Sequence, residues 1–128
     1  MRIETYFQQV RAIIESAPIV ASSDIAYDKR SAHEGFIRGE IFMLDGSILH
    51  IREYVDVETQ IERLTYAYQY MDAQKNLIFR YDNTGHSKHK HLASFPHHKH
   101  EKNDVVASAA PDLDRVLEDV SRLMSISE

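Results

Sequence analysis

The spacing of apolar residues changes twice along this chain of 128 residues. Near the N-terminus they recur every three or four positions, which predicts an amphipathic helix that Pro18 ends. From about Asp24 to Asp82 apolar and polar residues alternate, which is typical of half-buried strands. After Pro111 the helical spacing returns. An N-terminal and a C-terminal helix are therefore expected to flank a set of strands.

Turn signals divide the alternating region into separate strands. We expect strands over residues 24–28, 34–44, 47–55, 62–71 and 76–82, which form an antiparallel β-meander of four or five strands. Asp45-Gly46 predicts a tight type I′ hairpin, because both residues tolerate positive φ. The two helical stripes need an apolar surface, and one face of the meander provides it. The sequence therefore predicts an α+β fold, a two-layer sandwich that residues 1–128 form as a single domain.

The region from Asn83 to about Val106 has no clean period and is predicted to be a long, His-rich functional loop. The chain contains eight histidines, and six of them lie in this region: His86, His89, His91, His97, His98 and His100. The formal net charge of the chain is −5, yet residues 80–102 hold five Lys or Arg against two acidic residues. A cationic segment on an acidic protein can still form a confined phosphate site.

Imidazole and lysine side chains in one loop are compatible with two chemistries. Two imidazoles beside cations are sufficient for metal-independent RNA cleavage, because one accepts the proton of the 2′-hydroxyl and the other protonates the leaving oxygen. Two or three imidazoles with a carboxylate also form a divalent-metal site. The spacing does not decide between them, and a solvated histidine tract is the simplest alternative.

Three further residues stand out on the expected strands. Glu53 shares the apolar side of its strand, so its carboxylate needs a partner, such as Arg80 or a histidine, or must reach solvent at the strand end. Arg80 and Asp82 project to one face, where the Arg can clamp a phosphate and the Asp can hold the Arg or orient an imidazole. The alternating Tyr66, Tyr68 and Tyr70 could stack on bases, but packing against the helices is favoured.

The absence of cysteine excludes a disulfide scaffold and a thiolate zinc site. No apolar run approaches the roughly 20 residues that span a bilayer. We therefore expect a cytoplasmic protein without a membrane contact.

Several motifs together resemble the TumE-like toxin family. They are Asn76-Leu-Ile-Phe-Arg-Tyr-Asp-Asn83, His86 and Phe95-Pro-His-His-Lys-His100, preceded by Asp45-Gly46-Ser47 and by Tyr66 and Tyr68. The resemblance implies the toxin component of a toxin–antitoxin module, with a DNA-binding antitoxin as its partner. The chain departs from the family pattern in having Asn83-Thr-Gly-His86 in place of Asn-Ala-Pro-His, and in its added His89 and His91.

The leading prediction is a toxin ribonuclease that needs no cofactor. The acid–base candidates are His86, His98 and His100, with Glu53 or Asp82 orienting an imidazole. The predicted phosphate or RNA ligands are Arg80, Lys99, His97 and Tyr81. Two alternatives stay open: a non-enzymatic module whose loop binds an acidic protein or a nucleic-acid backbone, and a metal-dependent nuclease or phosphodiesterase that uses Glu53, Asp82 and the histidines. A homodimer also stays open.

Overall fold

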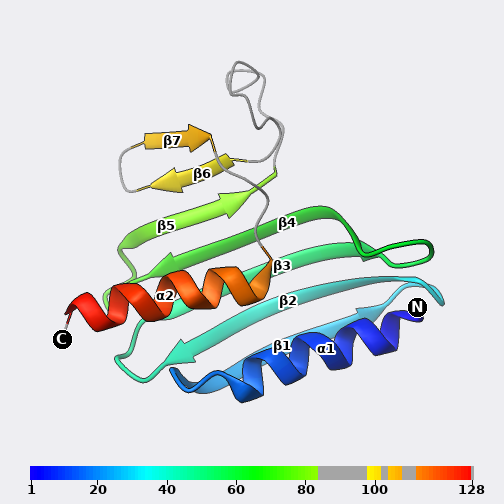
Figure 1. Cartoon of the computed structure of the whole chain (residues 1–128), viewed down its shortest axis with the longest axis horizontal. Coiled ribbons are helices and arrows are strands. Elements are labelled where there is room, and N and C mark those ends of the chain that lie inside the picture. Colours follow the sequence, from blue (N-terminus) through cyan, green and yellow to red (C-terminus); the bar gives the residue numbers. More distant parts are fainter. Residues whose placement is uncertain (84–97, 102–103, 108–111, 128) are drawn as a thin grey trace.

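The computed structural model describes residues 1–83, 98–101, 104–107 and 112–127, with the backbone alone described for 98–101, 104–107 and 125–127 (Figure 1). The elements in chain order are α1 (Ile3–Ser16), β1 (Val20–Lys29), β2 (Glu34–Met43), β3 (Ile48–Asp56), β4 (Glu62–Met71), β5 (Leu77–Asp82), β6 (His98–Glu101), β7 (Asp104–Ala107) and α2 (Leu113–Ser127). The expected order of helix, antiparallel strands and helix is confirmed.

The strands form one seven-stranded antiparallel sheet whose spatial order is the order of the sequence. The expected meander of four or five strands is therefore correct in topology but two or three strands short. β6 and β7 come from the region that was predicted to be a loop, and each has only four residues. Charged and histidine residues occupy β6, so the apolar alternation that marks a strand is absent from the sequence there.

Both helices lie against one face of the sheet and complete the predicted two-layer α+β sandwich (Figure 1). The apolar side of α1 and the apolar side of α2 join the inward residues of β2 to β5 in one hydrophobic cluster. The helix α1 packs so closely on β2 that residue 35 has room only for glycine. A Cβ atom at Gly35 would lie 2.5 Å from the ring of Phe7 and 2.7 Å from Ile3 Cγ1. No helix among the described residues is both long enough and apolar enough to span a membrane.

The turn at Asp45-Gly46 joins β2 to β3, but it is not a type I′ turn. Gly46 has a φ of 87°, whereas Asp45 is not among the described residues with positive φ. The N–H of Gly46 donates to the carbonyl of Met43 at 3.1 Å. This is the arrangement of a type I turn followed by a glycine bulge, in which only the glycine needs the left-handed region. The first strand also differs, since β1 begins at Val20 rather than Asp24.

Candidate functional site

The sheet face opposite the helices, called the open face below, carries most of the polar side chains of the central strands. The pairing of β2 to β5 arranges these residues in two adjacent rows across the sheet, because directly paired residues share a face. One row contains Arg38, Arg52, Ala67 and Asp82, and the other contains Glu40, His50, Gln69 and Arg80. In the described part of the chain no helix covers this face.

Arg80 is held in place by residues on either side of it. Its Nε donates to Asp82 Oδ2 at 2.8 Å, and its Nη1 donates to Gln69 Oε1, also at 2.8 Å. The Arg80 side chain is 33% exposed, so the pair is not a freely solvated surface ion pair. These two bonds leave the Nη2 amino group without a partner among the described residues. A guanidinium fixed in this way is pre-organised to bind an anion through its remaining N–H groups.

The backbone register brings β6 alongside this guanidinium. His100 is paired with Arg80, and His98 is paired with Asp82. Positions 98 and 100 therefore belong to the open face, beside the Arg80–Asp82 pair. Lys99 is paired with Tyr81, which puts position 99 on the face that the helices cover. His86 and His97 lie outside the described residues.

Glu53 is on the other face of the sheet, buried beneath α1. Its carboxylate, 1% exposed, accepts a hydrogen bond from the Tyr68 hydroxyl at 2.6 Å and a second one from the Tyr6 hydroxyl. Arg63 Nη1 donates to the Tyr68 hydroxyl at 3.0 Å. The expected partners, Arg80 or a histidine, are wrong, and so is the alternative in which Glu53 reaches solvent. The cause is the strand pleat, which directs residues 53 and 80 to opposite faces.

The tyrosine hydroxyls that contact Glu53 have strongly raised pKa values. Burial, and next the negative charge of Glu53, raise the pKa of Tyr6 and of Tyr68 far above the usual value. Both phenols therefore stay protonated and serve as hydrogen-bond donors to the carboxylate at neutral pH. Because the Glu53 and Asp82 side chains lie on opposite faces of the sheet, the two carboxylates cannot bind one metal ion together, and the metal site expected from both of them is wrong. The described residues contain no cluster of three metal-ligating side chains.

Tyr81 was expected to bind RNA, but its side chain points into the helix layer. Its hydroxyl donates to Asp119 Oδ2 on α2 at 2.8 Å, and the residue is 6% exposed. Burial and the hydrogen bond to Asp119 raise the pKa of Tyr81 to about 12. Tyr66, Tyr68 and Tyr70 are buried in the core as well, so the favoured packing role of this stripe is confirmed.

Four residues of the open face were missed in the sequence. Arg38 on β2 and Arg52 on β3 are directly paired and exposed, and Phe36 is paired with Tyr54 beside them. The alternation within each strand already separates these residues from the apolar positions. What it does not supply is the register that places them opposite one another.

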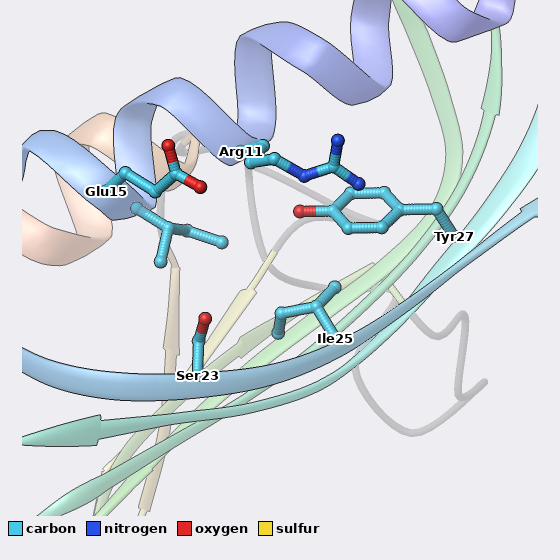
Figure 2. A pocket seen from close by; sticks show the side chains of 6 residues that line it. Arg11, Glu15, Ser23, Ile25 and Tyr27 are labelled. Atoms are coloured by element: carbon cyan, nitrogen blue, oxygen red, sulfur yellow. The ribbon is translucent and has the colours of Figure 1, made fainter.

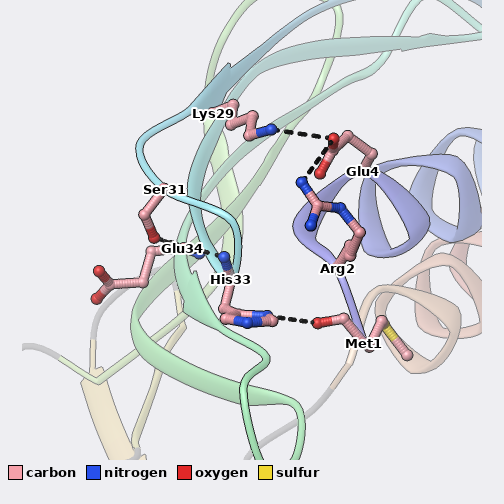
Figure 3. Close-up of polar contacts among 7 residues, drawn as sticks. All are labelled: Met1, Arg2, Glu4, Lys29, Ser31, His33 and Glu34. Carbon is pink, nitrogen blue, oxygen red and sulfur yellow. Dashed lines mark hydrogen bonds and ion pairs between the residues drawn. The ribbon is translucent and has the colours of Figure 1, made fainter.

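Other polar contacts lie far from this arrangement in the fold. A hollow of about 170 Å³ between α1 and β1 is lined by Arg11, Glu15 and Tyr27, among others, and the Arg11 guanidinium lies 4.8 Å from the centre of the Tyr27 ring (Figure 2). At the start of α1, the His33 imidazole Nδ1 is 2.9 Å from the carbonyl oxygen of Met1 (Figure 3). Arg11, Tyr27 and His33 therefore already have protein partners.

The fold and the site define a small two-layer α+β protein with an arginine-centred polar surface on the free face of its sheet. The family model described as toxin TumE matches residues 10–127. The chain belongs to this toxin family and is the toxin component of a toxin–antitoxin module, which implies an antitoxin partner. No curated protein and no solved structure matches the chain.

Proposed function

We propose that this toxin is a metal-independent ribonuclease whose reaction takes place on the open face where β5 meets β6. The observation that carries the proposal is the pairing of His98 with Asp82 and of His100 with Arg80. It supports a site in which two imidazoles adjoin a guanidinium that is already held in place. Imidazole is the side chain that exchanges protons near pH 7.

The proposed reaction is an intramolecular phosphoryl transfer. One imidazole accepts the proton of the ribose 2′-hydroxyl while the 2′-oxygen forms a bond to phosphorus. The bond from phosphorus to the 5′-oxygen of the next nucleotide breaks, and the second imidazole donates a proton to that oxygen. The products are a 2′,3′-cyclic phosphate and a 5′-hydroxyl end. His98 and His100 take these two roles, and His86 is the third candidate.

Arg80 supplies the positive charge in this scheme. Its Nη2 amino group binds the non-bridging phosphate oxygens, on which negative charge accumulates in the transition state. Asp82, 2% exposed, fixes the orientation of the guanidinium through Nε, and Gln69 fixes it through Nη1. Asp82 and Gln69 are therefore positioning residues. Neither Glu53 nor Tyr81 takes part, because both side chains belong to the helix-covered face.

The test is cleavage of cellular RNA by the purified toxin with and without a chelator. Removal of one imidazole of an acid–base pair is expected to cost about 10²–10⁴-fold in rate, so His98→Ala and His100→Ala should be nearly inactive. Arg80→Gln should also lose activity, and Arg80→Lys should recover little, because lysine lacks the planar fork. The rate should depend on pH with a bell-shaped profile around the imidazole pKa values.

His33→Ala is the matched control, since His33 lies near the start of α1 and its imidazole contacts Met1. It should cleave at the wild-type rate. Full activity of His98→Ala and His100→Ala would refute the proposed site, and loss of activity with the chelator would replace it with a metal-dependent mechanism. Growth inhibition on expression, relieved by the antitoxin, tests the toxin role separately from the chemistry.

A further inference from the structure

Arg38 and Arg52 face each other across β2 and β3 on the open face. Both are exposed, and within the described part of the chain neither forms an ion pair or a side-chain hydrogen bond. Like charges directly opposite each other on adjacent strands destabilise a sheet. The nearest acidic residue of the neighbouring row, Glu40, is instead 3.9 Å from the His50 imidazole. An external anion is the group that would compensate this pair.

An aromatic pair occupies the next position along the same two strands. Phe36 and Tyr54 are directly paired, their ring centroids are 6.2 Å apart at an edge-to-face angle of 62°, and both are only partly buried. Each lies two residues from one of the arginines, which is about 7 Å along a strand. Partly exposed aromatic rings beside cations are the combination that binds single-stranded nucleic acid, because bases stack on the rings while phosphates bind the cations.

The position of these four residues relative to Arg80 gives the path of the ligand. Arg52 and Asp82 are in one row and are separated only by Ala67 on β4, so two strand spacings, or about 10 Å, lie between them. Ala67 is buried, with 7% of its surface exposed, so its methyl group does not project between them. At this separation a strand bound at Arg38 and Arg52 can reach the Arg80 guanidinium across β4.

We infer that Phe36, Arg38, Arg52 and Tyr54 form a binding site for single-stranded RNA, which holds the substrate beside the cleavage site. The inference rests on the proposed ribonuclease for the identity of the ligand as RNA, but it concerns binding rather than cleavage. Phosphates contact Arg38 and Arg52, and bases stack on Phe36 and Tyr54. Specificity for single strands follows because a paired duplex does not expose its base faces.

The test measures binding with a probe that the proposed reaction cannot consume. The probe is a fluorescein-labelled, 2′-O-methyl single-stranded RNA of 12 nucleotides, and its anisotropy is titrated with toxin at 50 and 200 mM salt. In single strands each phosphate contact contributes about 0.7 to the slope of log affinity against log salt concentration. The slope for the Arg38→Gln/Arg52→Gln variant, which removes two such contacts, should be shallower by about 1.4 than the wild-type slope. The fourfold rise in salt should then weaken its binding about sevenfold less than it weakens wild-type binding.

A second variant separates stacking from charge. Tyr54→Leu should weaken binding roughly tenfold with an unchanged salt slope, since stacking releases no counterions. The control, Arg2→Gln/Lys75→Gln, removes the same charge from an exposed residue before α1 and from the turn after β4, and should bind as wild type does. Each variant is first checked for a wild-type unfolding midpoint.

The outcomes distinguish this inference from the ribonuclease proposal. Wild-type affinity and salt slope in Arg38→Gln/Arg52→Gln would overturn the inference, even if RNA is cleaved. An equal loss in the control variant would also overturn it, because the effect would then be one of net charge. Binding that depends on the pair, in a protein that cleaves no RNA, would overturn the ribonuclease proposal alone.

Discussion

The buried carboxylate of Glu53 gives the sharpest prediction, because two roles for it lead to opposite results. If Glu53 is structural, as its contacts with Tyr6 and Tyr68 indicate, its loss lowers stability and leaves the chemistry intact. If it takes part in catalysis, its loss lowers activity in a folded protein. The two roles separate when a variant keeps the hydrogen bonds and removes only the ionisable group.

Glu53→Ala removes an acceptor that two buried hydroxyls share. Breaking such a buried, charge-assisted network costs about 3–5 kcal/mol, because the remaining polar groups are left without partners. For a domain of this size each kcal/mol lowers Tm by about 3–5 °C, so a decrease of about 10–25 °C is expected. Glu58→Ala, an exposed change on the connection after β3, should stay within about 0.5 kcal/mol of wild type.

Glu53→Gln should cost only about 1–2 kcal/mol. Its amide oxygen can accept from Tyr68, whose hydroxyl already accepts from Arg63, and its amide nitrogen can donate to Tyr6. Urea unfolding gives the free energy of unfolding, and RNA cleavage by the folded variant gives the rate. A Glu53→Gln protein that folds normally and does not cleave would refute a structural role. A Glu53→Ala protein within about 1 kcal/mol of wild type would refute the energetic reasoning.

Three further predictions concern the stability of the fold. The pKa of Tyr81 is about 12 in the folded protein, above its ordinary value of 10, so its contribution to stability should be lost as pH rises from 10 through 12. Between pH 9 and 11 the free energy of unfolding in urea should fall less in Tyr81→Phe than in the wild type. An equal fall in both proteins would contradict the raised pKa of Tyr81. Gly35→Ala should destabilise the protein by about 1–3 kcal/mol, because the new Cβ would lie 2.5 Å from the Phe7 ring; an unchanged urea midpoint would mean that α1 shifts freely. Lys75 has a φ of 67°, so Lys75→Gly should raise the free energy of unfolding by about 0.5–1 kcal/mol, and a decrease would count against backbone strain in this turn.

The sequence predicted the central strands well, because their side chains alternate between a covered and an open face. The limits of β4 were predicted without error, and those of β2, β3 and β5 within one residue. The strand β1 was predicted too short, since most of its residues are exposed and include Ser and Asp. β6 was missed for a similar reason, because its sequence His-Lys-His-Glu has no apolar face and pairing with β5 supplies its structure.

The candidate site was predicted in part. Arg80 and Asp82 were expected on one face, and their hydrogen bond confirms this. Glu53 was recognised as a carboxylate on an apolar side that needs a partner, but the partner on α1, Tyr6, is 47 residues away in the chain. Contacts between layers depend on how a helix is laid on the sheet, and strand periodicity carries no information about this.

The sequence by itself determined the α+β class, the two amphipathic helices and the resemblance to a toxin family, because periodicity and local motifs are properties of neighbouring residues. Only the tertiary structure decided which polar residues meet. A period of two assigns each residue to one of two sides, and the pairing of strands then determines its neighbours on that side. For this reason Glu53 belongs to the core and Arg38, Arg52 and Arg80 belong to the open face.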